Sequence, residues 1–425
     1  MKVKETKGIT LIALVITIVV LLILAGVVIA TLNGNDNIIK NANTAVGKYN
    51  EKVNEEQGIL DTLEEKLREY TNGGSSNPTT PEEPGTPSTP PTVDSNGLAT
   101  KPTTIKPSTN NANNLQIVIP TGFAPAILQT GKTQSLPGQD GNVKNKMPAS
   151  QWNNITAEDI NKGIVVVDAD GNEFVWIPIT DASKFARTAW TTIYGYDASG
   201  TYQYGTCTTP HQFADKSTEN RWWEDTNTTE YTKMVTSVTN NKGFYVARYE
   251  ASATSYTRIA QSKRDAKTWT TISQTDAITA SAYYNSTLHS HLMYGIEWDS
   301  VLNWLNGNAT ISSSTNGQTK TMELADLQTN SCSWGNYDNS TGNAATNSGS
   351  LQKTGTSEYW KANNIYDLAG NAAELTQEKY STGTDRAIRG GVSGYGGGNY
   401  PAACRNYPGT SDATYGLGFR FSFYL

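Results

Sequence analysis

The sequence predicts an α+β fold in which a long N-terminal helix and a disordered linker carry a C-terminal domain of short strands and few helices. Three observations support this prediction. Residues 9–32 form an uncharged apolar run, eight of the 16 prolines lie within residues 72–113, and the remaining chain alternates short β-like runs with Gly, Asn and Ser turns. We therefore divide the chain into a leader (1–8), a helix (9–71), a linker (72–113) and a domain (114–425).

The apolar run at residues 9–32 is long enough to cross a membrane. Its 24 residues would extend about 36 Å as a helix, more than the roughly 30 Å of a bilayer core. Three lysines precede it, and such basic flanks stay on the cytoplasmic side. Beyond it, apolar and aromatic residues from Ala42 to Tyr70 recur in alternating steps of four and three. This pattern predicts an amphipathic helix that either packs on a partner helix or serves as a rigid spacer.

The linker has a different composition from the segments on either side. Residues 72–113 are rich in Pro, Thr, Ser, Gly and Asn. Such a segment has too little apolar surface to fold, so we expect it to be extended and partly polyproline II. It would hold the C-terminal domain away from the membrane, which favours a role outside the cell.

The C-terminal domain contains three clear strand patterns and one helix pattern. Residues 163–168 and 172–178 read as strands that flank a tight turn, and residues 243–249 read as another strand. Residues 297–305 read as a helix, because Trp298, Val301 and Leu305 share one face.

Charge and cysteine usage exclude two classes of function. The net charge is −6 and the chain has no basic stripe, so we expect no nucleic-acid partner. The three cysteines, Cys207, Cys332 and Cys404, lie far apart and form no C-x-x-C pair. This spacing excludes a zinc ribbon and a thioredoxin-type site, and leaves open either one extracellular disulfide or three isolated buried residues.

The N-terminal junction Lys7-Gly8-Ile9-Thr10-Leu11-Ile12 resembles the processing site of type IV pilins and pseudopilins. The resemblance implies that a prepilin peptidase cleaves after Gly8 and that Ile9 becomes the methylated N-terminus. The family usually has Glu where this chain has Ala13. Because a buried ammonium without a counter-charge is costly, this departure favours a tip or minor subunit among pilin-like subunits, or a plain membrane anchor. The expected location is the cell surface, in the cytoplasmic (inner) membrane or in a pilus.

A second resemblance covers roughly residues 165–425 and rests on an ordered series of motifs. They are Phe174-Val-Trp-Ile-Pro178, Phe244-Tyr-Val-Ala-Arg-Tyr-Glu250, Trp298-Asp-Ser-Val-Leu-Asn-Trp304, Asn364-Ile-Tyr-Asp-Leu-Ala-Gly370, Arg389-Gly-Gly391 and Gly418-Phe-Arg420. The series is similar to the formylglycine-generating enzyme (sulfatase-modifying factor) family. The resemblance implies a C-type lectin-like fold.

The chain lacks the two cysteines that this family needs for oxidase activity. They would lie in the loop after Arg389-Gly-Gly391, where this chain has Tyr395 and Tyr400, and Cys404 lies outside the pattern. Thiolate chemistry and copper binding both require those sulfurs. We therefore expect a protein that is not an enzyme and binds no copper.

The family's helix-turn motif appears here as Gly370-Asn-Ala-Ala-Glu-Leu375. The resemblance implies that Asn371 and Glu374 help to hold a structural calcium ion (Ca2+), which prefers oxygen ligands. The alternative is that Glu374 pairs with a core arginine such as Arg389 or Arg420.

Histidines give a weaker metal signal. His289 and His291 would place two imidazoles on one strand face, which is half of a zinc site. The alternative is a turn or a buried structural histidine. The sequence contains no G-x-S-x-G, H-E-x-x-H or P-loop motif that would signal a nucleophile or a phosphate site.

The segment between Gly391 and Gly418 has the composition of a binding surface, since Tyr supplies rigid contact area and small polar residues supply adaptable hydrogen bonds. The candidate ligand-binding residues are Tyr395, Asn399, Tyr400, Arg405, Asn406, Tyr407, Ser411, Asp412, Thr414 and Tyr415. The alternative is ordinary packing of glycine-rich loops. C-type lectin-like domains of this subtype are also targets of diversity-generating retroelements, so the resemblance implies a diversified surface.

Together these features predict an adhesin or receptor-binding minor pilin that presents a non-catalytic, lectin-like domain to an extracellular protein or glycan. Two alternatives stay open. One is a surface enzyme of the sulfatase-modifying-factor family with an unknown reaction, and the other is a structural pseudopilin of a secretion filament.

Overall fold

The computed structural model describes residues 90–128, 143–196, 202–212, 222–226, 228–253, 258–313, 318–380, 386–406 and 416–425. All of them belong to one compact unit, Pro87–Leu425. The expected leader (1–8), the expected helix (9–71) and the first part of the expected linker lie outside the described residues. Within the described ranges, no helix has the length and apolar character needed to cross a bilayer.

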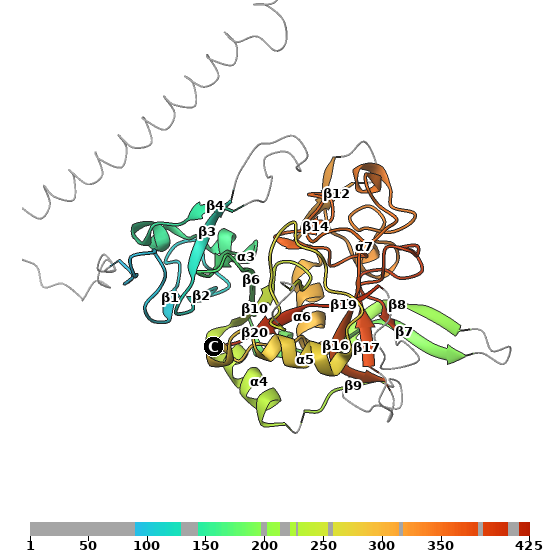
Figure 1. Cartoon of the computed structure of the whole chain (residues 1–425), viewed down its shortest axis with the longest axis horizontal. Coiled ribbons are helices and arrows are strands. Elements are labelled where there is room, and N and C mark those ends of the chain that lie inside the picture. Colours follow the sequence, from blue (N-terminus) through green and yellow to red (C-terminus); the bar gives the residue numbers. More distant parts are fainter. Residues whose placement is uncertain are drawn as a thin grey trace, which may run out of the picture. The chain divides into compact units, whose positions relative to one another are not determined.

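A seven-stranded antiparallel sheet forms the centre of the domain (Figure 1). Its strand order is β11-β20-β10-β6-β5-β3-β4. In chain order the strands are β3 (Ala124–Leu128), β4 (Val143–Lys146), β5 (Val165–Val167), β6 (Glu173–Pro178), β10 (Gly243–Ala247), β11 (His291–Leu292) and β20 (Phe421–Phe423). The chain ends next to β20, where the carbonyl of Leu425 accepts a hydrogen bond from the hydroxyl of Ser237.

The central strands are buried on both faces. In β6, Val175 and Ile177 belong to one hydrophobic core, whereas Phe174 and Trp176 belong to the other. This follows from the alternation of side chains along a strand. Helices α4 (Thr229–Asn241) and α6 (Gly295–Leu305) contribute to the first core, and α3 (Ala157–Asn161) and α5 (Gln274–Ala282) contribute to the second. The sheet is therefore the middle of three layers.

A second sheet has the order β18-β17-β16-β19, with β9 also paired to β16. Its strands are β9 (Trp222–Trp223), β16 (Ala373–Tyr380), β17 (Arg386–Arg389), β18 (Arg405–Asn406) and β19 (Leu417–Phe419). Only the β16–β19 pair is parallel among its described pairings. The strands that flank residues 407–415 in the chain, β18 and β19, lie at opposite ends of this strand order, separated by β17 and β16.

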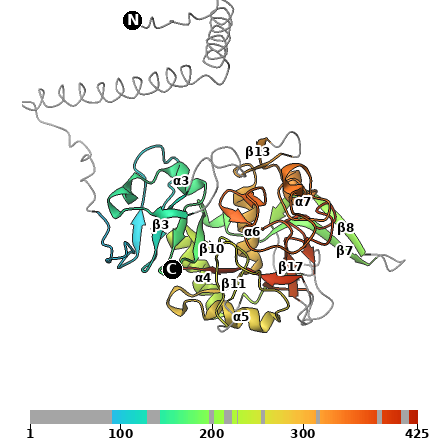
Figure 2. The same ribbon diagram turned by 45° about the horizontal axis from the view of Figure 1, so that its top comes forward.

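Besides four 3-10 helices (Ala149–Asn154, Ala182–Lys184, Ser286–Leu288 and Gly342–Ala345), the described structure contains four two-stranded pairs and one further α-helix. They are β1–β2 (Thr103–Ile105 and Ile117–Ile119), β7–β8 (Thr188–Tyr196 and Tyr202–Gln212), β12–β13 (Thr310–Ser312 and Thr319–Thr321), β14–β15 (Lys361–Ala362 and Ile365–Tyr366) and α7 (Leu324–Gln328). The β7–β8 hairpin projects from the rest of the domain, as both views show (Figures 1 and 2).

The structure confirms the individual strand and helix predictions. The expected strands 163–168, 172–178 and 243–249 correspond to β5, β6 and β10, and the turn between the first two contains Gly171 at φ +81°. The expected helix 297–305 corresponds to α6, in which Trp298, Val301 and Leu305 are fully buried.

The predicted fold class, an α+β domain of C-type lectin-like fold, is wrong, and the long N-terminal helix that was part of this prediction lies outside the described residues. The described chain is mostly β-sheet with few helices, of which the longest, α4, has 13 residues. The physical reason is that short apolar runs closed by Gly and Asn turns satisfy their backbone by pairing with strands that are distant in sequence. Sequence periodicity reveals a strand but not its distant partner.

The structure also corrects the expected end of the linker. Residues 90–113 fold as part of the domain, because β1 pairs with β2 and the side chains of Leu98 and Ile105 are buried. The few apolar residues in this polar stretch are enough to attach it to the second core, through contacts that composition does not report.

Candidate functional site

A cavity of about 510 Å³ is lined by residues from both ends of the segment between Gly391 and Gly418. We call it the C-terminal cavity. Its wall comes from β16, β17, β18 and β19, from the loop that follows Arg389 and from residues 349–351. Asn406 and Gly416, which flank residues 407–415, both line it. Its size is within the range of about 300–1,000 Å³ that is typical of ligand sites.

Glycines make the turn at the base of this cavity. Gly390 and Gly391 have φ values of +87° and +77°, in the left-handed region that favours glycine. A Cβ atom on Gly391 would lie 2.3 Å from the carbonyl oxygen of Tyr400. The Arg389-Gly-Gly391 motif is therefore required by backbone geometry, because a larger residue would displace the loop.

Backbone hydrogen bonds fasten the loop that carries the candidate residues. The amide of Ser393 donates to the carbonyl of Asn371 (3.0 Å), and the carbonyl of Tyr395 accepts from the amide of Asp338 (3.2 Å). The amide of Tyr400 donates to the carbonyl of Gly396 (3.0 Å). The loop's shape thus depends little on the side chains that it presents.

Two tyrosines form an aromatic rim on the C-terminal cavity. Tyr395 is 57% exposed and is one of only three large apolar side chains that are exposed among the described residues. Tyr400 is half-buried, and the two rings meet edge to face with centroids 5.2 Å apart. Asn399 is exposed on the same loop but does not line the cavity. An exposed aromatic held on a fixed backbone is a suitable contact for a ligand.

A buried network of ion pairs supports the cavity from below. Arg389, which lines it, donates to Asp299 (3.0 Å) and Glu378 (3.3 Å). Arg405 donates to the same two carboxylates, and Arg187 also pairs with Glu378. Burial and the neighbouring Arg405 guanidinium lower the pKa of Arg389 to about 9, so it is still charged at neutral pH. The network fixes the register of β16, β17 and β18 beneath the loop.

The assignment of Arg405 to ligand contact needs correction. Arg405 is fully buried, and its guanidinium is used by Glu378, Asp299 and the carbonyl of Thr188 (2.9 Å). The sequence places it beside surface residues, but on strand β18 its side chain points into the ion-pair network because neighbours on a strand face opposite sides. The remaining candidates Tyr407, Ser411, Asp412, Thr414 and Tyr415 lie outside the described residues.

Cys404 lines the C-terminal cavity but lacks the features of a reactive thiol. Its side chain is buried, and burial raises its pKa to about 12, so the thiol is protonated at neutral pH. Cys332 is also buried and reduced, and its Sγ lies 2.9 Å from Oδ1 of Asn339. The expectation that the chain is not an enzyme stays a prediction.

Asn371 and Glu374 are described and buried, but they do not suit a calcium ion. Both carboxylate oxygens of Glu374 accept hydrogen bonds from Arg420, the shortest at 2.7 Å. The Oδ1 atom of Asn371 accepts from the side chain of Asn336 and the amide of Gln352, both at 2.9 Å. A cation bound to Glu374 would meet the guanidinium, so the geometry favours the ion-pair alternative. No cluster of His, Cys, Asp and Glu suited to a metal occurs among the described residues.

The two histidines have structural surroundings. His289 stacks on Tyr424 with ring centroids 4.8 Å apart. His291 is buried, with its Nε2 atom 3.0 Å from Glu297 and 3.1 Å from the hydroxyl of Ser422. The two rings therefore do not form the half-site for zinc.

One wall of the C-terminal cavity could not be predicted from the sequence. Residues 349–351 reach it because the side chain of Asn336 donates to the carbonyl of Ser350 (2.9 Å) and accepts from the amide of Gly349 (3.0 Å). Although the side chain of Asn336 fixes this loop by hydrogen bonds, the sequence does not distinguish it from the many other asparagines. This part of the site is visible only in three dimensions.

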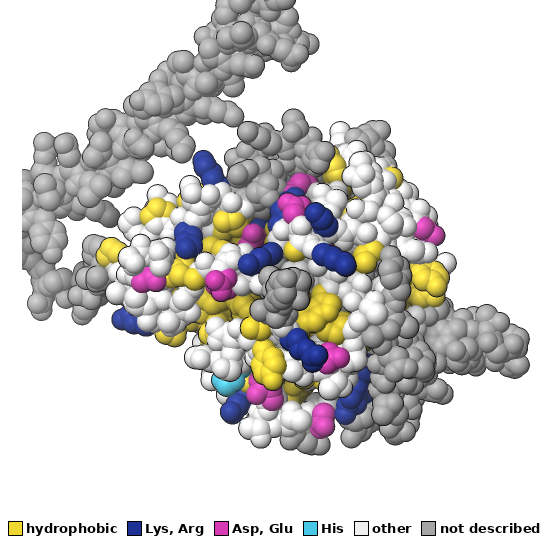
Figure 3. All heavy atoms as spheres, in the orientation of Figure 1, with side chains coloured by type: hydrophobic (Ala, Val, Ile, Leu, Met, Phe, Trp, Pro, Cys, Tyr) yellow, Lys and Arg dark blue, Asp and Glu magenta, His cyan; other side chains and the backbone are white. Residues whose placement is uncertain are grey.

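The surface charge is mixed on the face drawn in Figure 3. Lys and Arg side chains alternate with Asp and Glu side chains among polar and apolar atoms. The described side chains of this face therefore form no basic stripe of the kind that a nucleic-acid backbone attracts.

Comparisons with known proteins leave the family open. No family model and no curated protein matches the chain. Among solved structures, PvdO from Pseudomonas aeruginosa is 13% identical, with a TM-score of 0.33 over 60% of this chain and 96% of PvdO. Treponema denticola variable protein 1 is 13% identical, with a TM-score of 0.22 over 76% of this chain and 100% of that protein. TM-scores of this size carry no argument, so both resemblances of the sequence stay predictions.

Proposed function

We propose that this chain is a cell-surface or pilus-associated protein that binds an extracellular protein or glycan through the C-terminal cavity and its tyrosine rim. One observation carries the proposal: Tyr395 is 57% exposed beside a cavity of about 510 Å³, on a loop that backbone hydrogen bonds hold in place. Aromatic side chains are enriched among the residues that dominate binding energy at interfaces.

Binding of the purified full chain to intact cells and to a glycan array tests this proposal. The variant replaces Tyr395 and Tyr400 with Ala. The matched control is Tyr283→Ala, because Tyr283 is equally accessible, at 63% exposed, but lies at the end of α5 and does not line the cavity. We expect the double variant to bind about 10–100-fold more weakly, as for the loss of two aromatic anchors, and the control to bind like the parent chain.

Two results would contradict the proposal. Equal losses in the double variant and in Tyr283→Ala would show that binding does not depend on the cavity. If the folded parent chain binds neither cells nor glycans, the structural pseudopilin becomes the better explanation, and loss of filament assembly on deletion of residues 87–425 would support it.

Attachment to the membrane or to a pilus is a separate part of the proposal. It rests on the apolar run at residues 9–32 and on the Gly8–Ile9 junction. Replacing Gly8 with Val should block processing by prepilin peptidase, and N-terminal sequencing should find Ile9 first in the parent protein. A mature parent protein that still begins at Met1 would leave only a membrane anchor.

A further inference from the structure

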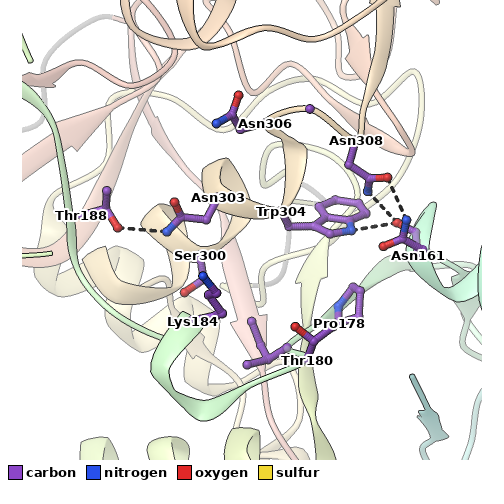
Figure 4. A pocket seen from close by; sticks show the side chains of 12 residues that line it. Asn161, Pro178, Thr180, Lys184, Thr188, Ser300, Asn303, Trp304, Asn306 and Asn308 are labelled. Carbon is purple, nitrogen blue, oxygen red and sulfur yellow. Dashed lines mark hydrogen bonds between the residues drawn. The ribbon is translucent and has the colours of Figure 1, made fainter. Parts of the chain in front are cut away.

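A second cavity, of about 620 Å³, lies at the C-terminal end of α6 (Figure 4). We call it the asparagine cavity, because four asparagines line it: Asn161, Asn303, Asn306 and Asn308. They come from α3, from α6 and from the turn that follows α6. The sequence does not predict that these four residues meet, because more than a hundred residues separate Asn161 from the others.

Three of the twelve lining residues, Asn161, Trp304 and Asn308, are held in place by hydrogen bonds to one another. The carbonyl of Asn161 accepts from the indole N–H of Trp304 and from the side chain of Asn308, both at 2.8 Å. The side chain of Asn161 in turn donates to Oδ1 of Asn308 (2.9 Å). Figure 4 shows these three side chains pointing toward one another. This wall is therefore formed before any ligand arrives.

Two other lining residues, Asn303 and Asn306, offer hydrogen-bonding groups to a ligand. Asn303 donates to the hydroxyl of Thr188 (2.9 Å), while its Oδ1 atom bonds to no described residue. The exposed side chain of Asn306 makes no hydrogen bond with any described residue. A side-chain amide both donates and accepts, which is the pairing capacity that a sugar hydroxyl requires.

The charge of the asparagine cavity restricts its ligand further. No carboxylate is among its twelve lining residues, so a cation would find no counter-charge. Lys184 is the one charged residue among them, and there is no arginine to grip a phosphate in a bidentate way. Pro178, Ile179 and Trp304 add apolar surface. Amides, hydroxyls and apolar patches together fit a neutral molecule that has many hydroxyls and apolar ring faces.

We propose that the asparagine cavity is a binding site for a neutral saccharide. Asn303 and Asn306 bond to its hydroxyl groups, and the wall of Asn161, Trp304 and Asn308 sets its orientation. This site is distinct from the C-terminal cavity and does not rest on the proposed function, because the two lining sets share no residue.

Titration calorimetry and saturation-transfer NMR of the full chain test this proposal with free neutral sugars: methyl glucoside, methyl galactoside, methyl mannoside, N-acetylglucosamine, lactose and maltose. We expect at least one to bind at millimolar concentration or tighter. Asn306→Ala and Asn303→Ala should each weaken binding about tenfold, as for one or two lost hydrogen bonds. The matched control is Asn113→Ala, because Asn113 is exposed and lines neither cavity. Asn306 has no described partner, so its variant should fold normally.

Three outcomes would overturn the proposal. The first is no binding of any of these sugars at 10 mM to a folded chain. The second is binding that Tyr395→Ala removes and Asn306→Ala does not, which assigns the sugar to the C-terminal cavity. The third outcome is measured with methyl glucuronide added as an anionic probe: binding of this sugar alone that Lys184→Ala abolishes would make the cavity an anion site instead.

Discussion

The C-terminal cavity and the asparagine cavity are built in opposite ways. Backbone geometry shapes the first, through the glycine turn at Gly390 and Gly391 and the amide bonds of the loop after it. Side chains shape the second, through the mutual bonds of Asn161, Asn308 and Trp304. The rim of the C-terminal cavity therefore tolerates exchange of its side chains, whereas the wall of Asn161, Trp304 and Asn308 in the asparagine cavity does not. A diversified binding surface would need the first kind of construction.

The two cavities nevertheless share one support. Asp299 on α6 accepts a hydrogen bond from Arg389, which lines the C-terminal cavity, at 3.0 Å. Its other oxygen accepts from the amide of Thr188, which lines the asparagine cavity, at 2.9 Å. One buried carboxylate therefore supports both sites. A substitution of Asp299 should affect both cavities, whereas a substitution in the wall of one cavity should affect that cavity alone.

The largest effect is expected for Asp299→Ala, which should damage both cavities. It leaves Arg389 and Arg405 buried with one carboxylate fewer, and breaking a buried ion pair on one side costs roughly 3–5 kcal/mol. Urea unfolding measures this loss. The control is Asp225→Ala, since Asp225 is exposed and should change the free energy of unfolding by less than about 0.5 kcal/mol. A loss below about 1 kcal/mol for Asp299→Ala would refute the shared support.

Gly391→Ala should damage the C-terminal cavity alone. The new methyl group collides with the carbonyl of Tyr400 and occupies a left-handed conformation, which costs on the order of 1–3 kcal/mol. Ligand binding by the tyrosine rim should fall with stability, while sugar binding by the asparagine cavity stays unchanged. The matched control is Gly394→Ala, because a Cβ atom on Gly394 meets nothing within 4 Å. Equal effects of the two substitutions would contradict the backbone account of this loop.

Thr188→Val should perturb the asparagine cavity alone, and more weakly. Valine keeps the shape of Thr188 but removes the hydroxyl that accepts from Asn303, a hydrogen bond worth about 0.5–1.5 kcal/mol. Sugar affinity should fall, because the amide of Asn303 loses its fixed orientation, while binding at the tyrosine rim persists. Thr275→Val is the matched control, since Thr275 is exposed on α5 and lines neither cavity. Sugar affinity that stays at the parent value would argue against Asn303 as a positioned contact.

The sequence predicted the parts of this molecule that depend on local pattern. The alternation of Phe174 to Pro178 predicted β6, and the spacing of Trp298, Val301 and Leu305 predicted α6. Composition identified Tyr395 and Tyr400 as candidate contacts, and both line the C-terminal cavity.

What the sequence could not predict depends on pairings across long distances. The fold class was wrong because sheet order is set by partners such as β10 and β20, which lie far apart in the chain. Arg405 was placed at the surface because its partners Asp299 and Glu378 are more than twenty residues away. The asparagine cavity escaped notice for the same reason, since Asn161 meets Asn308 only through the fold.

The smallest expected effect is a pH dependence of the free energy of unfolding. It arises at the N-terminal end of α6, which is the end remote from the asparagine cavity. Burial lowers the pKa of His291, but the Glu297 carboxylate and the carbonyl of His289 more than offset it, so the pKa lies above its usual 6.5. A pKa raised by folding stabilises the native state below the unfolded pKa, and this contribution is lost as pH rises through the folded value. The free energy of unfolding of the parent chain should therefore fall more steeply above about pH 6.5 than that of His291→Gln. Subtracting the two profiles removes the other titrating groups, among them Asp367, whose pKa burial raises to about 7. Parallel profiles would mean that the ion pair of His291 and Glu297 does not form, and that only hydrogen bonds fix this end of α6.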